Sequence, residues 1–171
     1  MELKKIIVVV TSYCGGTDSD KKELMTKTIC KNIKKQGLDL CLSTHSPVDK
    51  ETQQYCDFVV YDSDNSFQYF DQPGTGAYTN HGVAEIKLVW NALKLVEQKG
   101  YTHILKVAFD NIPVIDYNDV INLCFETNKD IVTSKWFGNE LTLGSHLFFS
   151  KIDTFWSTCG PDVIFNYKPI G

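Results

Sequence analysis

A carboxylate and an amide, Asp110 and Asn111, follow directly after an apolar run at residues 104–109. Only Lys106 interrupts this run, and Pro113, which cannot donate a hydrogen bond to a sheet, comes soon after it. The pattern predicts a buried central strand with Asp110 at its carboxyl end. In open α/β sheets ligands bind at that edge, because the connecting loops open a crevice there. We therefore expect the chemistry of this chain to depend on Asp110.

Polar residues also follow two other predicted strands. The run at 4–10 leads into Thr11-Ser12-Tyr13 and then two glycines, a loop in which backbone amides can approach a ligand closely. An ordinary turn explains these residues equally well, because the loop lacks the glycine spacing of dinucleotide-binding and phosphate-binding loops. Asp62 follows the apolar residues 58–61, and there a turn closed by the aspartate side chain is the favoured interpretation.

Strand and helix patterns alternate along the chain and would bring these residues to one edge of a sheet. In chain order the predicted elements are a strand at 4–10, a helix at 18–36, a strand at 38–43, a short helix at 49–55, a strand at 58–61, an aromatic-rich loop at 66–79, a helix from Asn80-His81-Gly82 to Gly100, the strand before Asp110, a helix at 117–125, strands at 130–136 and 143–149, and a short helix at 151–156. This alternation predicts an α/β fold with a mainly parallel central sheet and helices on both faces.

The composition is that of one ordinary globular domain over residues 1–171, long enough to bury a substantial core. A net charge of −4 argues against duplex nucleic acid as the main partner, because binding to phosphates needs a basic surface. The longest wholly apolar run, residues 6–10, is too short for a membrane span or a signal peptide, so we expect a soluble, cytoplasmic protein. The six cysteines have no C-x-x-C spacing and are expected to be reduced thiols. The chain stops at Gly171 without an obvious closing element, which leaves open that it is truncated or is the front of a larger protein.

The arrangement of these motifs resembles the nucleotide-binding part of GT-A-type glycosyltransferases over residues 4–157. In that family a polar loop after the first strand holds the base and ribose of a nucleotide sugar. A later helix starts at Asn-x-Gly and leads through a glycine into a strand that ends in Asp-x-Asp. The corresponding segments here are Thr11-Ser12-Tyr13, Asn80-His81-Gly82 and Ala108-Phe109-Asp110. The resemblance implies a single Rossmann-like GT-A domain that binds a nucleotide diphosphate sugar.

The chain departs from the family at Ala108, which replaces the first aspartate of Asp-x-Asp. The resemblance implies that Asp110, helped by Asn111, holds a divalent cation, Mn²⁺ or Mg²⁺, together with the diphosphate. Such hard cations take carboxylate and phosphate oxygens as ligands. Lys106 could supply positive charge directly if its side chain points to the site.

The resemblance also implies roles at the nucleoside end of the site. Thr11 and Ser12 would hold the nucleoside, and Asp62 would hold the base or the ribose. Asn80, at the start of the helix motif that includes Gly82, would shape the donor pocket.

A transferase that inverts the sugar also needs a carboxylate that takes the proton of the acceptor hydroxyl. Asp153 and Glu140 are the acidic residues available after the motif, and Asp153 ranks first.

Two functions of different classes fit this sequence. The first is a glycosyltransferase that moves a sugar from a nucleotide diphosphate to a hydroxyl of a glycan, protein or lipid acceptor. The alternative is a degenerate module of the same fold that has lost metal chemistry with Ala108 and serves in nucleotide-sugar binding or assembly. The two hypotheses make opposite predictions about manganese-dependent binding of nucleotide diphosphates. A phosphate-binding domain of the nucleotidyltransferase or Rossmann kind fits less well, because the first loop lacks the required glycines.

Overall fold

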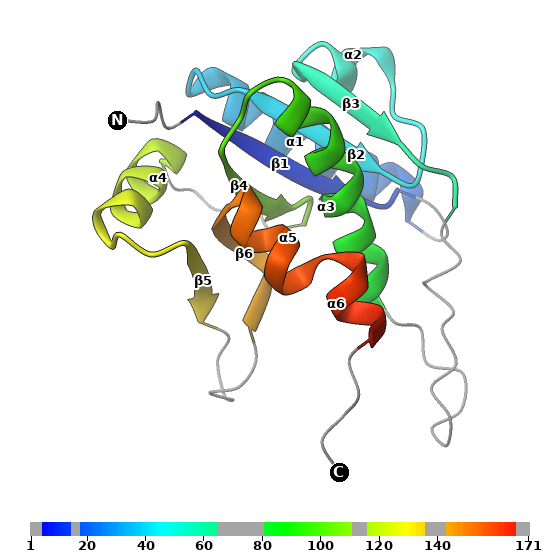
Figure 1. The fold of residues 1–171 in the computed structure, drawn as a ribbon. Coiled ribbons are helices and arrows are strands. Elements are labelled where there is room, and N and C mark those ends of the chain that lie inside the picture. Colours follow the sequence, from blue (N-terminus) through cyan, green and yellow to red (C-terminus); the bar gives the residue numbers. More distant parts are fainter. Residues whose placement is uncertain (1–4, 15–17, 65–80, 111–115, 136–142, 167–171) are drawn as a thin grey trace.

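The computed structural model describes residues 5–14, 18–64, 81–110, 116–135 and 143–166. In chain order (Figure 1) the elements are β1 (Ile6–Ser12), α1 (Ser19–Lys35), β2 (Leu40–Thr44), α2 (Lys50–Gln53), β3 (Phe58–Tyr61), α3 (His81–Gln98), β4 (His103–Ala108), α4 (Tyr117–Glu126), β5 (Ile131–Lys135), β6 (Leu143–Lys151), α5 (Ile152–Cys159) and α6 (Pro161–Asn166). The predicted alternation of strands and helices is confirmed as far as α5. The short helix α6 was not predicted, although Pro161 at its first position is a common start signal.

The strands form one six-stranded sheet in the order β3-β2-β1-β4-β6-β5. β1 pairs in parallel with β2 and β4, β2 pairs in parallel with β3, and β6 runs antiparallel to β4 and β5. The mainly parallel sheet is therefore confirmed, with β6 reversed within it. The chain first adds strands on one side of β1 and then places β4 on its other side. Ligands of open α/β sheets bind beyond the carboxyl ends of the strands at such a switch point.

Helices cover both faces of the sheet, as predicted. On one face Val8 of β1 shares a buried cluster with Ile33 of α1 and with residues of α4. On the other face Val9 shares a second cluster with Leu93 of α3 and Phe155 of α5. Figure 1 shows α3, α5 and α6 together on the near side of the sheet. Because both faces of β1 are covered, residues 6–11 of the strand are an unbroken run of β-branched residues and do not alternate between apolar and polar.

The first strand is longer than predicted. Thr11 and Ser12 belong to β1 and pair with Ser43 and Thr44 of β2, whereas the sequence predicted that a loop begins at Thr11. The hydrogen-bonded ladder continues past the apolar residues because these four side chains are small enough to be buried under the helices. Strand geometry therefore fixes which face of the sheet Thr11 and Ser12 serve.

Glycines end two of the helices at the predicted positions. Gly37 after α1 has a φ of 74° and Gly100 after α3 has a φ of 79°. This left-handed conformation is the usual one just beyond a helix end, where glycine is favoured because it has no Cβ.

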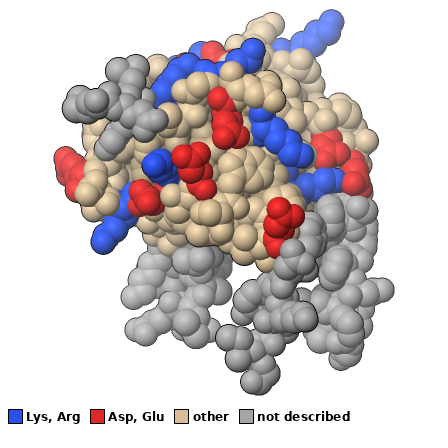
Figure 2. Space-filling model, viewed as in Figure 1, with Lys and Arg blue, Asp and Glu red and all other residues tan. Residues whose placement is uncertain are grey.

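The charged side chains on the face shown in Figure 2 are mixed in sign and do not form one broad basic patch. None of the helices in the described ranges is long and apolar enough to cross a membrane. All six cysteines are free thiols, as predicted.

Candidate functional site

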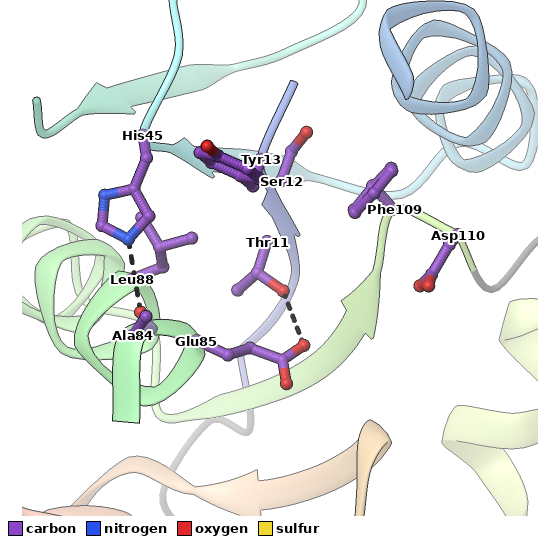
Figure 3. A pocket seen from close by; sticks show the side chains of 9 residues that line it. All are labelled: Thr11, Ser12, Tyr13, His45, Ala84, Glu85, Leu88, Phe109 and Asp110. Carbon is purple, nitrogen blue, oxygen red and sulfur yellow. Dashed lines mark hydrogen bonds between the residues drawn. The ribbon is translucent and has the colours of Figure 1, made fainter. Parts of the chain in front are cut away.

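A cavity of about 240 Å³ lies beyond the carboxyl ends of β1, β2 and β4, beside the first turns of α3 (Figure 3). It therefore occupies the switch point between β1 and β4, where the topology predicts a ligand. The residues that line it come from four separate segments of the chain: Thr11, Ser12, Tyr13, His45, Ala84, Glu85, Leu88, Phe109 and Asp110.

The last residues of β1 form the floor of this cavity. Thr11 faces α3, and its hydroxyl donates a hydrogen bond of 3.3 Å to Glu85 Oε1. Ser12 points the other way, because successive strand residues alternate, and its Oγ lies 2.7 Å from the hydroxyl of Thr26 on α1. Tyr13 is half-buried, with Lys22 Nζ 5.2 Å from the centre of its ring. The structure thus brings the predicted segment Thr11-Ser12-Tyr13 to the cavity.

A buried ion pair lies under the same wall. Lys106 of β4 is fully buried, and its ammonium donates to Glu85 Oε1, the oxygen that also accepts from Thr11. Burial lowers the pKa of Lys106 from its ordinary value, while the negative charges of Glu85 and, less strongly, Asp110 act to raise it. Lys106 does not line the cavity, because its side chain is fully buried against Glu85. Its charge is met by Glu85, so the predicted direct use of Lys106 toward a ligand does not fit this arrangement.

Asp110 lines the cavity just beyond the end of β4, as the sequence predicted. Its side chain is exposed, and it makes no hydrogen bond or ion pair with the residues that the structure describes. Ala108, two residues earlier, is buried at 3% exposure beside Thr11 in the strand register and contributes nothing to the cavity wall.

The described ranges contain no group of three histidine, cysteine, aspartate or glutamate side chains that could hold a metal ion. A free carboxylate at Asp110 suits a cation that takes its other ligands from phosphate oxygens and water, which is how Mg²⁺ is usually bound with nucleotides. The residues present therefore fit a cation that enters together with a diphosphate.

Two polar cavity residues, His45 and Glu85, were missed at the sequence level. His45 follows β2, and its Nδ1 lies 2.9 Å from the carbonyl oxygen of Asp62, to which it donates. The rule that drew attention to Asp110, a polar residue after a strand, would have found His45 if applied to β2. Glu85 lies inside a helix, where an acidic residue gives no such signal, and only the packing of α3 on the sheet places it in the cavity wall.

Asp62 holds β3 to α3 and does not line the cavity. Its carboxylate accepts 2.7 Å from Asn91 Nδ2 and lies 3.1 Å from Lys87 Nζ. Burial acts to raise the pKa of Asp62, but hydrogen bonds from the backbone N–H of Asp64 and from Lys87 and Asn91 outweigh it and hold that pKa below the ordinary value. The contacts of Asp62 therefore favour a structural role for this residue over the binding of a base or a ribose.

The strand register places Asp153 near the amino end of β4, whereas Asp110 lies beyond its carboxyl end. Lys151, which directly precedes α5, pairs with His103 at the start of β4, whereas Asp110 follows the end of β4. About 20 Å of strand separate these two ends, since a strand rises about 3.3 Å per residue. The structure therefore does not bring Asp153 to the cavity, and a role as base there does not fit.

The remaining predicted site residues are Gly82, Asn80, Asn111 and Glu140. Gly82 lies in the first turn of α3, which borders the cavity. Asn80, Asn111 and Glu140 fall outside the described residues.

No protein-family model matches this chain, and no curated protein matches it either. A solved structure from Desulfovibrio desulfuricans G20, a "putative nucleotide-diphospho-sugar transferase", has a similar fold. The match covers 96% of this chain and 71% of that chain, with a TM-score of 0.53 and 10% sequence identity. At this level of identity the likeness shows the fold alone.

Proposed function

We propose that this chain is a single GT-A-type domain, spanning residues 1–171, that binds a nucleotide diphosphate sugar and transfers the sugar to an acceptor hydroxyl. The observation that carries this proposal is the cavity at the switch point, which joins Thr11-Ser12-Tyr13 to Asp110 at one edge of the sheet. The fold it shares with a protein named for nucleotide-diphospho-sugar transfer supports the same function.

The charges of the chain favour a cation at Asp110. All 17 basic residues are lysines, so no arginine is available to grip a diphosphate with two parallel hydrogen bonds. Lys106, which lies under the wall of the cavity, is fully buried in its pair with Glu85. We therefore assign to Asp110, with Asn111, a divalent cation such as Mn²⁺ or Mg²⁺ that would stabilise the leaving diphosphate.

The protein's own part in the reaction is to position the donor at this edge. The bond between the sugar's anomeric carbon and the diphosphate oxygen breaks, the acceptor oxygen bonds to that carbon, and a base takes the hydroxyl proton. Glu140 is the carboxylate that we propose for that base, since Asp153 lies near the amino end of β4. The acceptor would be a glycan, a protein or a lipid.

A second candidate function rests on Ala108. Because this residue offers no carboxylate, a domain that binds nucleotide sugars without transferring the sugar is the alternative.

Titration calorimetry with uridine, guanosine and cytidine diphosphates, each with and without Mn²⁺, tests the proposal. The transferase proposal requires that one diphosphate binds, that Mn²⁺ tightens binding, and that Asp110→Ala removes the Mn²⁺ effect. Metal-independent binding with no transfer to water or to acceptor mixtures would favour the binding module. If no diphosphate binds the wild-type protein under any condition, both functions are excluded.

A further inference from the structure

Glu85 brings a carboxylate to the place where the strand motif has none. Lys106 and Ala108 are two residues apart on β4 and so face the same side, toward α3. Ala108 pairs in register with Thr11, and the Thr11 hydroxyl donates to Glu85. The Glu85 carboxylate therefore stands over the stretch of sheet formed by Lys106, Ala108 and Thr11.

One oxygen of this carboxylate is committed and the other is not. Oε1 accepts from both Lys106 and Thr11, whereas Oε2 accepts no hydrogen bond from the described residues. Glu85 also lines the cavity, and its side chain is 21% exposed. Oε2 is thus a fixed hydrogen-bond acceptor available to a ligand in the cavity.

Charge decides which part of a nucleotide this acceptor can receive. A carboxylate repels a diphosphate unless a cation lies between them, and the charge of Glu85 is already met by Lys106. Glu85 is therefore suited to a neutral group that donates hydrogen bonds. A nucleoside offers two such groups, the ribose hydroxyls and the N–H groups of the base.

The order of residues along the cavity favours the ribose. In Figure 3, Thr11 and Glu85 lie between His45 on one side and Asp110 on the other, with the Tyr13 ring near His45. The rings of Tyr13 and His45 suit the flat face of a base, and Asp110 suits the diphosphate with its cation. The ribose is the part of a nucleotide that lies between those two.

We propose that Glu85 binds the ribose hydroxyls of the donor and so makes the site selective for ribonucleotides over 2′-deoxyribonucleotides. This inference rests on the proposed nucleotide site. It assigns the selectivity to a residue of α3 that the Ala108-Phe109-Asp110 motif does not contain.

The test compares the binding of uridine diphosphate with that of 2′-deoxyuridine diphosphate, and likewise the guanosine and cytidine pairs, by calorimetry with Mn²⁺. The proteins are the wild type, Lys106→Met, and the double variant Glu85→Met with Lys106→Met. The double variant removes both charges of the buried pair, so no buried charge is left alone, and it differs from Lys106→Met only at residue 85. Circular dichroism confirms that each variant is folded.

The wild type and Lys106→Met should bind the ribonucleotide about ten- to a hundred-fold more tightly than the deoxyribonucleotide, the range for one hydrogen bond to a charged group. In the double variant this ratio should fall to about one. A ratio near one in the wild type, or a ratio kept in the double variant, overturns the inference. An equal loss of binding affinity for the ribonucleotide and the deoxyribonucleotide in the double variant also overturns the inference, since that result would mean that Glu85 contacts the base.

The nucleotide site itself is tested separately by Asp110→Ala, which should weaken the binding of the ribonucleotide and of the deoxyribonucleotide in each pair equally. If diphosphates bind and depend on Asp110 but show no ribose selectivity, the proposed function stands and only the role of Glu85 fails. If nothing binds to the wild type, both fail.

Discussion

Substitution of Glu85 by Met should destabilise the protein strongly and in a way that depends on pH. Lys106 is fully buried, and Glu85 is its ion-pair partner. Without that partner the ammonium stays charged in an apolar layer or releases its proton. At pH 7 release costs about 5 kcal/mol at most, because the ordinary pKa of 10.5 lies about 3.5 pH units higher and each unit is worth about 1.4 kcal/mol. We therefore expect Glu85→Met to lower the free energy of unfolding by about 3–5 kcal/mol at pH 7.

The sign of the pH dependence follows from the proton count. In a variant that releases this proton on folding, Lys106 is neutral in the folded state, while in the unfolded chain it stays protonated up to its ordinary pKa of 10.5. The unfolded state then binds one more proton, so the free energy of unfolding rises with pH by about 1.4 kcal/mol per unit. In the wild type burial also lowers the pKa of Lys106, but the negative charge of Glu85 opposes it, so the folded wild type holds this proton more tightly than the variant does. The difference in stability between the two proteins should therefore shrink as the pH rises from 7 to 9.

Urea denaturation of both proteins at pH 7, 8 and 9 measures this difference directly. Lys106→Met removes the group that titrates and should show no such convergence with the wild type. The double variant with Glu85→Met should be close to the wild type in stability, because a buried pair replaced by apolar residues of similar size is often neutral. A deficit for Glu85→Met that is below about 1 kcal/mol, or that is constant with pH, would refute the assignment of a buried ion pair.

Three further predictions concern other parts of the molecule. Asp62→Asn should destabilise the protein at pH 7 but match the wild type near pH 2. A carboxylate whose pKa is lowered by folding stabilises the folded state above its ordinary pKa of 3.8 and loses that effect as the pH falls through its folded-state pKa. Thermal melts of both proteins across this pH range measure the difference. Leu93→Ala should lower the free energy of unfolding by about 2–5 kcal/mol in urea, since Leu93 is fully buried, whereas Leu123→Ala, at a position 62% exposed, should change it by about 0.5 kcal/mol or less. Asp110→Ala should leave the melting temperature of the free protein nearly unchanged, because the side chain is exposed, and should lower only the shift that a diphosphate with Mn²⁺ produces.

Strand and helix periodicity is the part of the sequence that predicts this fold best. The unbroken β-branched run of β1 and the amphipathic spacing of α1 and α3 are local patterns, and Asp110 is found by the rule that ligands bind at strand ends. Local patterns do not say which way a single polar side chain of a strand points. The sequence therefore allows Lys106 to point toward the ligand, although it faces α3 and pairs with Glu85.

The remaining differences come from contacts between distant segments. Glu85 is a cavity residue only because α3 packs on the sheet, and Asp153 is distant from Asp110 only because β6 runs antiparallel to β4. Neither fact has a sequence signal within a few residues of the side chain concerned. Asp62 shows a third case, because a turn residue and a ligand residue look alike until Lys87 and Asn91 are seen beside it.

The pairing of β1 with β4 at the middle of the sheet also has a consequence for how the protein forms during synthesis. The backbone of Lys5 and the side chain of Thr102, where these strands begin, are hydrogen-bonded although 97 residues apart in the chain. A ribosome adds about 5–20 residues per second, so β1 waits on the order of 5–20 s for its central partner. During that time β1 can pair only with β2, which in turn pairs with β3, and the distant pairing with β4 is slow to form. The cavity, which needs residues from both 11–13 and 109–110, is thus a late product of folding, and nascent chains that end before Asp110 lack it.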